Sequence, residues 1–188
     1  MTTETDIKDA ALQDIGRSAH AALAEMVAAL QCDYERLGEL RMMRDDSGFP
    51  SRVLTQNPDH SLGWWEDQYP NGAAELAELE AAAGDCADEE QARQRIQEDP
   101  LSVEFRSDWY ADPREFTPAE FCVLLSAGGP AVRIIGELSG RWGYSGVRLQ
   151  AQDWFTPWTD YRGADVGMIE AYLDCLGVAE MVDSFGGR

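Results

Sequence analysis

The sequence predicts an α+β fold, with a long N-terminal helix and acidic helical segments, then a four-stranded antiparallel meander and a C-terminal helix. Two observations lead to this prediction. Apolar residues recur every three or four positions through the first half of the chain, which is typical of helices. After Pro100 the pattern changes to short alternating runs separated by glycines, which is typical of strands. We therefore expect a single domain over residues 1–188, with a helical part at 1–99 and a sheet with a closing helix at 100–188.

The first helical stretch carries a continuous apolar stripe from Leu12 to Leu40. Its steps of three and four predict that residues of about 5–44 form one long helix or two collinear ones. Gly16 and Gly38 lie inside this stretch, and a glycine in a helix interior costs about 1 kcal/mol. We therefore expect any break or kink to lie near one of these two glycines.

Residues 47–71 show neither helical nor alternating periodicity and contain three prolines and two glycines, so we expect a long irregular loop. The loop carries Trp64 and Trp65, for which two interpretations are open. Either the two indoles bury against the core, or they anchor a partner. Beyond the loop, helical spacing returns and predicts helices at about 72–83 and 87–98.

The sequence of the second half of the chain predicts an antiparallel meander. Alternating apolar runs predict four strands, at 101–109, 121–127, 131–138 and 146–154. Between the second and third of these, the sequence Gly128-Gly129-Pro130 predicts a hairpin turn, because glycine tolerates a positive φ. Helical spacing over about 167–176 then predicts the closing helix.

The chain carries 35 Asp and Glu against 15 Lys and Arg, a formal net charge of −20. Phosphates and anionic lipids are bound by Lys and Arg, so this balance argues against a nucleic-acid binder and against a protein held on an anionic membrane. The acidic N-terminus and the lack of a long apolar run predict a cytoplasmic protein of a bacterial host cell. The four cysteines lie far apart, which predicts reduced thiols and no metal site.

More than half of the net charge lies in one quarter of the chain, because residues 45–92 carry 12 acidic residues and 1 basic one. Between 53 and 92 there are ten carboxylates and no Lys or Arg. The cations that would neutralise a helix face at i,i+4 are therefore missing, and we expect the carboxylates to repel one another. Two interpretations are open: the tract is a solvated face of an acidic protein, or it occupies a cationic groove built for nucleic acid.

The sequence predicts no catalytic residue, no cofactor and no enzymatic activity. His20 and His60 are the only histidines, and no metalloprotease, nucleophile-elbow, phosphate-binding or dinucleotide-binding motif occurs. A carboxylate pair such as Glu137 and Asp153 could act as acid and base, but a chain with 35 acids contains such pairs by chance. The aromatic segment 152–161 is either a hydrophobic lid at a strand end or a platform that stacks on a ligand.

The second half contains the segments EDPLSVEFRSDWY (98–110), EFCVLLSAGGPAVRIIGEL (120–138) and RLQAQDWFTPWTDY (148–161). The first half contains EMVAALQCDYERLGELR (25–41) and AAELAELEAAAGDCADEEQARQRIQEDP (73–100). These segments resemble a group of small acidic proteins carried by integrative elements, plasmids and phages of proteobacteria. The 47–71 loop and the tail GVAEMVDSFGGR depart from that group. The resemblance implies a counter-defence role, such as that of an anti-CRISPR protein, and it brings no catalytic residue with it.

We therefore expect a non-enzymatic inhibitor of a bacterial defence complex, of the anti-CRISPR kind and directed against a type I surveillance complex. Its acidic, DNA-mimic-like face would block a cationic nucleic-acid-binding surface of that complex or of another defence nuclease. The expected partner-binding residues are Asp59, Trp64, Trp65, Glu66, Asp67, Tyr69, Glu75, Glu78, Glu80, Asp85, Asp88, Glu89 and Glu90. The alternative is a protein-binding adaptor or regulator of mobile-element machinery, which would bind through the sheet and the aromatic residues of 152–161.

Overall fold

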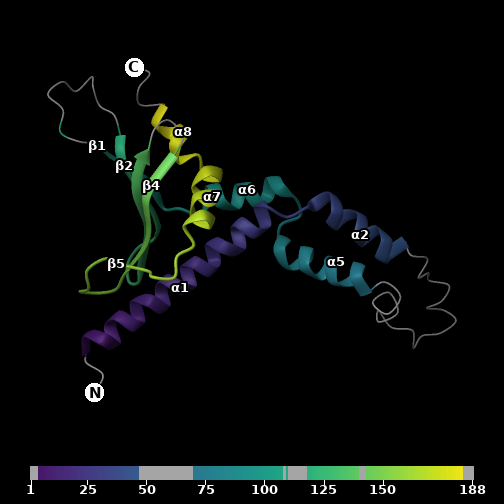
Figure 1. The fold of residues 1–188 in the computed structure, drawn as a ribbon, viewed down its shortest axis with the longest axis horizontal. Helices are drawn as coiled ribbons and strands as arrows, with labels where there is room; N and C mark the ends of the chain where they lie inside the picture. Colours follow the sequence, from purple (N-terminus) through teal and green to yellow (C-terminus); the bar gives the residue numbers. More distant parts are fainter. Residues whose placement is uncertain (1–3, 47–69, 108, 110–117, 140–142, 184–188) are drawn as a thin grey trace. The chain divides into compact units, whose positions relative to one another are not determined.

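The computed structural model describes residues 4–46, 70–107, 109, 118–139 and 143–183 (Figure 1). Its helices are α1 (Glu4–Leu30), α2 (Tyr34–Asp46), α5 (Pro70–Ala83), α6 (Glu89–Glu98), α7 (Val166–Leu176) and α8 (Val178–Asp183). Its strands are β1 (Ser102–Ser107), β2 (Pro118–Ser126), β3 (Ala131–Ser139), β4 (Gly143–Gln152) and β5 (Thr159–Asp160). Long helices followed by an antiparallel sheet and a C-terminal helix confirm the predicted α+β class. Within these described ranges, no helix is both long enough and apolar enough to cross a membrane.

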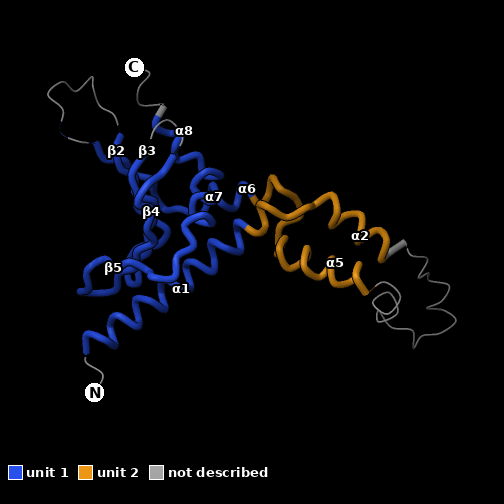
Figure 2. The backbone as a smooth tube through the Cα atoms, viewed as in Figure 1, with its two compact units in different colours: residues 1–27, 93–188 blue, residues 28–92 orange. Residues whose placement is uncertain are grey.

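The chain forms two compact units (Figure 2). The first contains residues 1–27 and 93–188, which include most of α1, the sheet, α7 and α8. The second contains residues 28–92, which include α2 and α5. The sequence divides the chain into helical and sheet parts at residue 99, whereas the structure groups most of the first helix with the sheet. The periodicity of a helix shows which face it buries but not which distant segment covers that face, so the sequence could not locate this division.

The helical stretch expected over 5–44 is interrupted at Gln31–Asp33, and not at either glycine. Asp33 immediately precedes α2 and caps it: its side-chain Oδ1 accepts a hydrogen bond from the backbone N–H of Arg36 at 2.9 Å, and its carbonyl accepts one from the N–H of Leu37 at 2.9 Å. An aspartate that satisfies the free N–H groups of a first helical turn is a favourable start for a new helix. The capping residue therefore decides where the stretch divides.

Polar contacts hold α1 to the segment that runs from β5 to the start of α7. Gln13 donates a hydrogen bond from Nε2 to the carbonyl of Asp160 and accepts one at Oε1 from the N–H of Arg162, both at 3.0 Å. About two turns further along α1, His20 accepts a hydrogen bond at Nε2 from the N–H of Asp165 at 2.9 Å. These bonds join residues about 145 positions apart in the chain, and they explain why most of α1 belongs to the unit that contains the sheet.

The sheet has five strands in the order β1-β2-β3-β4-β5, and every neighbouring pair is antiparallel. The four strands expected from the sequence are all present, and the hairpin expected at Gly128-Gly129-Pro130 joins β2 to β3, with Gly128 at a φ of 107°. The expected strand count is wrong by one, because Thr159 and Asp160 pair with the end of β4 as β5. Two residues are too few to produce an alternating pattern, so the sequence could not indicate this strand.

One face of the sheet contributes to the core of the first unit. Val123, Ile134 and Leu149 stand opposite one another on β2, β3 and β4, and all three are buried. α7 packs against β4, and Figure 1 shows this helix running beside the sheet. The helix is capped by Asp165 at its start and by Gly177, with a φ of 76°, at its end. These caps set the bounds of the closing helix that the sequence predicts at 167–176.

The second unit has its own small core between α2 and α5. Leu37, Leu40, Leu76 and Ala83 are buried together, and Tyr34 packs against them. Leu37 and Leu40 belong to the apolar stripe that the sequence shows up to Leu40, and Leu76 and Ala83 face them from α5. All four cysteines of the chain are free thiols.

Candidate partner-binding surfaces

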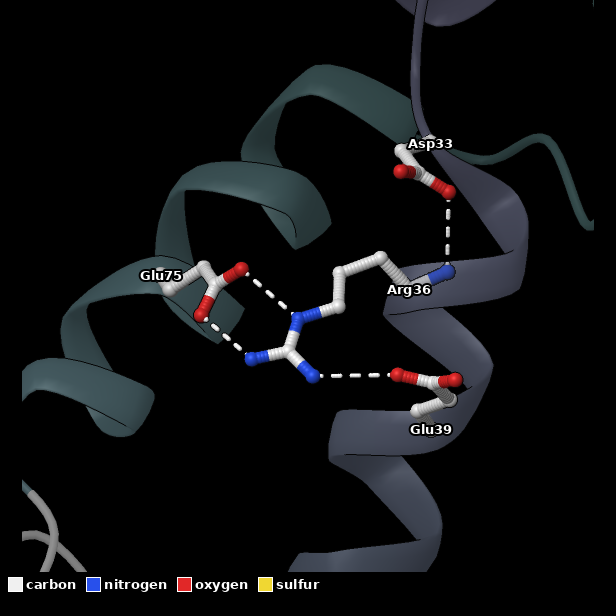
Figure 3. Close-up of polar contacts among 4 residues, drawn as sticks. All are labelled: Asp33, Arg36, Glu39 and Glu75. Carbon is white, nitrogen blue, oxygen red and sulfur yellow. Dashed lines mark hydrogen bonds and ion pairs between the residues drawn. The ribbon is translucent and has the colours of Figure 1, made fainter.

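The second unit holds an ion-pair network that joins α2 to α5 (Figure 3). The guanidinium of Arg36 donates two hydrogen bonds to the carboxylate of Glu75, from Nε at 2.8 Å and from Nη2 at 2.9 Å. Its remaining nitrogen, Nη1, donates to Glu39 at 3.0 Å. This bidentate geometry is the strongest form of an arginine–carboxylate contact. It fixes the two helices side by side.

The hydrogen bonds from Arg36 lower the pKa of the Glu75 carboxyl below its ordinary value of 4.5. The same contacts, first with Glu75 and then with Glu39, raise the pKa of the Arg36 guanidinium. Both groups are therefore charged at neutral pH, and Glu75 stays charged under mildly acidic conditions.

A second group of contacts lies further along the same two helices. Glu80 on α5 accepts a bond at Oε1 from Nε of Arg41 at 3.1 Å, and it lies 3.4 Å from Nη1 of Arg44. All three arginines of α2 thus contact carboxylates within the unit. The expectation that the carboxylates of the tract have no neutralising cations is wrong for Glu75 and Glu80. The reason is that the neutralising charges come from α2, which lies outside the 53–92 tract, and helix pairing brings them there.

The acidic residues around the start of α6 have a local structural role. Asp88 accepts a hydrogen bond at Oδ1 from the N–H of Gln91 at 2.8 Å, and its carbonyl accepts one from Ala92. Glu89 and Glu90 follow in the first turn of the helix, where negative charge is favoured by the helix dipole. Part of this predicted partner-binding set therefore stabilises its own helix.

The remaining predicted residues fall into two groups. Glu78 and Asp85 are exposed, on α5 and just after it. The others lie outside the residues that the structure describes, namely Asp59, Trp64, Trp65, Glu66, Asp67 and Tyr69.

The described part of the second unit is strongly acidic even after its ion pairs are counted. Residues 28–46 and 70–92 contain twelve Asp and Glu against three Arg, a net charge of −9. Each of the three arginines already contacts Glu39, Glu75 or Glu80. These two ranges contain no other Lys or Arg.

The Arg36–Glu75 pair leads to a prediction about acid stability. Because the folded state lowers the pKa of Glu75, the pair stabilises the protein above the ordinary carboxyl pKa of 4.5, and this contribution is lost as the pH falls below it. A Glu75→Gln variant is expected to be less stable than the wild type at pH 7, and the difference should shrink as the pH is lowered through 4. Urea unfolding of both proteins across this pH range measures the difference. A difference that is independent of pH would contradict this prediction.

A second candidate surface is the exposed face of the sheet, which we call the polar face. Strand register places Glu104, Cys122, Ile135 and Arg148 in one row across β1 to β4. The face is hollowed, with a volume of about 410 Å³. The charged residues that line the hollow are three arginines and three glutamates, Arg106, Arg133, Arg148, Glu104, Glu120 and Glu137. The hollow is therefore close to neutral.

On the same face, Arg133 connects the sheet to the aromatic segment 152–161. Its guanidinium lies 4.1 Å from the ring centre of Trp158, and its Nε donates to Gln150 at 2.9 Å. Gln150 in turn donates to Asp160 on β5 at 2.7 Å. This cation–π contact and hydrogen-bond chain keep Trp158 on the sheet.

The turn between β4 and β5 presents two aromatic side chains to solvent. The exposed fraction is 67% for Trp154 and 102% for Phe155. Asp153 and Thr156 close the turn with three hydrogen bonds of 2.8 to 3.0 Å. Phe155 has a φ of 63°, a left-handed conformation that costs about 1–2 kcal/mol for a residue other than glycine. A residue held in such a sparsely populated conformation marks a candidate functional position.

The sequence could not show the polar face or this turn as sites. The charged residues of the polar face come from four strands and lie up to 44 positions apart, so no local motif connects them. The QDWFTPW string does indicate clustered aromatic residues, but it does not tell which of them are exposed.

Comparisons with protein-family models, with curated proteins and with solved structures found no match for this chain.

Proposed function

We propose that this protein is a non-enzymatic inhibitor whose acidic second unit occupies a cationic, nucleic-acid-binding surface on a protein partner. In this proposal the partner is a bacterial defence complex, a type I CRISPR surveillance complex, and the protein acts as an anti-CRISPR protein. The inhibited complex would lose access to its nucleic acid because the protein covers the arginines and lysines that hold phosphates.

The observation that supports this proposal is the charge that remains on the second unit. Its described residues carry a net charge of −9, and all three of their cations are already paired with carboxylates. An acidic surface that neutralised itself would not attract a basic partner. Here the ion pairs hold α2 against α5 and leave Glu78 and Asp85 exposed.

The physical reason for this mode of binding is electrostatic steering. A concentrated negative charge attracts a basic groove over about a Debye length, which is about 8 Å at physiological ionic strength. Rim charges of this kind chiefly set the rate and the specificity of association. We therefore expect strong salt dependence.

The test measures competition for DNA. A purified type I surveillance complex is incubated with a labelled DNA duplex, and the DNA displaced by added protein is followed by gel shift. The wild-type protein is expected to displace the DNA. The triple variant Glu78→Gln, Asp85→Asn and Glu90→Gln is expected to compete about tenfold less well and with a flatter dependence on salt.

The matched control neutralises three acidic residues of the first unit, Glu25→Gln, Glu137→Gln and Glu170→Gln. It changes the net charge by the same amount, and it should compete as well as the wild type. If the wild-type protein displaces no DNA, the proposal is wrong. If both triple variants weaken competition equally, total charge and not the second unit is responsible, and the proposal is also wrong.

The turn between β4 and β5 supports a second candidate function, a protein-binding adaptor or regulator of mobile-element machinery. The exposed side chains of Trp154 and Phe155 would provide the apolar anchor, since aromatic residues dominate the energy of protein interfaces. A Phe155→Gly variant separates the two functions. It relieves the left-handed strain, so we expect it to unfold with a free energy about 1 kcal/mol higher than that of the wild type. The adaptor function requires that it lose its partner, whereas the inhibitor function requires that DNA competition be unchanged.

A further inference from the structure

Strand β1 is an edge of the sheet. It pairs with β2 on one side, and among the residues that the structure describes no other strand lies beside it. In an antiparallel sheet, every second residue of an edge strand directs its N–H and C=O groups away from the sheet. Such an edge is able to add another strand through backbone hydrogen bonds.

The side chains on this edge carry both signs of charge. Glu104 and Arg106 are two positions apart on β1, so they lie on the same face of the sheet, and both are exposed. Arg106 forms an ion pair with Glu120 on β2. Within the described residues Glu104 forms no ion pair, and its carboxylate accepts only a 3.3 Å hydrogen bond from the hydroxyl of Ser102.

We propose that two copies of this chain associate through β1, with the two strands antiparallel and a two-fold axis at Phe105. In this register Glu104 of one copy lies directly opposite Arg106 of the second copy, and the same pair forms again on the other side of the axis. The five-stranded sheets of the two copies then form one continuous sheet.

Charge complementarity selects this register. Moving the axis to Glu104 places two glutamates opposite each other, which is unfavourable. Moving one strand by a single residue turns its charged side chains to the other face of the sheet. The irregularity in the β1–β2 pairing lies between Arg106 and Ser107, so residues 104–106 at the axis are in regular strand geometry.

The opposite side of the strand also fits a second copy. Phe105 is half-buried and points to the face of the sheet that contributes to the core. At the proposed axis it stands opposite Phe105 of the second copy, and aromatic pairs across neighbouring strands stabilise a sheet. The proposed interface therefore contains one aromatic pair on one face of the sheet and two ion pairs on the other.

This proposal goes beyond the proposed function and is independent of it. It concerns the unit that contains the sheet, whereas the inhibitor function rests on the acidic residues of the second unit.

The test is sedimentation velocity of the full chain over a wide range of concentrations, at an ionic strength of about 0.15 M. The wild type is expected to dimerise reversibly. The single variants Glu104→Arg and Arg106→Glu each place like charges opposite each other twice, so each should raise the dissociation constant about tenfold. The double variant with both substitutions restores opposite charges, and its dissociation constant should return to within a few-fold of the wild-type value.

The two single variants distinguish an effect at the β1 edge from an effect of the net charge of the protein. Glu104→Arg changes the net charge from −20 to −18, and Arg106→Glu changes it to −22, so a charge effect alone would move the two dissociation constants in opposite directions. The matched control Glu137→Arg makes the same change as Glu104→Arg on the same face, two strands away from the edge, and should leave the dissociation constant unchanged. Circular dichroism confirms that each variant is folded. A monomeric wild type at all concentrations, or a double variant no better than the single ones, would overturn the proposal.

Discussion

A Tyr172→Phe variant is expected to unfold with a free energy about 1.5–3 kcal/mol lower than that of the wild type. The side chain of Tyr172 is fully buried on α7, and its hydroxyl donates a 2.7 Å hydrogen bond to Oδ2 of Asp99. Phenylalanine keeps the ring and its packing, but it deprives the Asp99 carboxylate of this donor. Hydrogen bonds to charged groups are the ones whose loss costs most. Urea denaturation measures the difference.

Two control variants separate the hydrogen bond from the ring. Asp99→Asn keeps an acceptor for the hydroxyl, so it should lower the free energy of unfolding by less than Tyr172→Phe does. Tyr34→Phe removes another buried hydroxyl, which has no hydrogen-bond partner among the described residues, and it should be neutral or stabilising. If Tyr34→Phe and Tyr172→Phe have the same effect, the contact with Asp99 is not what stabilises the protein.

The pH dependence of these variants follows from the same environment. Burial, and then the hydrogen bond and charge of Asp99, raise the pKa of Tyr172 above its ordinary value of 10.0. Burial also raises the pKa of Tyr34, to about 12. Above pH 10 the unfolded chain loses phenolic protons that the folded chain keeps, so the free energy of unfolding falls as the pH rises. The difference in the free energy of unfolding between the wild type and Tyr172→Phe should therefore become smaller above pH 10.

A Gly16→Ala variant is expected to unfold with a free energy about 1–3 kcal/mol lower than that of the wild type, although alanine is the better helix former. A Cβ atom at position 16 of α1 would lie 2.6 Å from Cβ of Tyr161 and 2.8 Å from its Cγ. Both atoms are close to the backbone of Tyr161, so a side-chain rotation cannot relieve the overlap. The helix would have to move away from residues 160–165, which would weaken its hydrogen bonds through Gln13 and His20. Thermal and urea denaturation report this loss.

The matched control is the same substitution at the other glycine of the helical stretch. Gly38 lies inside α2, and a Cβ atom there would meet nothing within 4 Å. Gly38→Ala should therefore stabilise the protein by about 0.5–1 kcal/mol, because alanine loses less conformational entropy than glycine. Two substitutions that are identical in sequence terms are thus expected to have opposite signs. Equal effects would show that Tyr161 does not restrict position 16.

The fold is more predictable from the sequence than the candidate sites are. The alternating runs predict four strands, and the hairpin at Gly128 joins β2 to β3 as expected. Both features depend on neighbouring residues only. The role of Glu75 depends on Arg36, which is 39 positions away, and no spacing rule connects the two.

The fold class, the main helices and strands and the concentration of negative charge in the middle of the chain follow from the sequence alone. These properties are local, since periodicity and composition can be counted along the chain. The tertiary structure alone settles which carboxylates are paired and that Thr159 and Asp160 add a fifth strand to the sheet. It also decided that α1 packs on residues near 160. Those properties depend on contacts between distant segments, whose free energy appears only when the chain has folded.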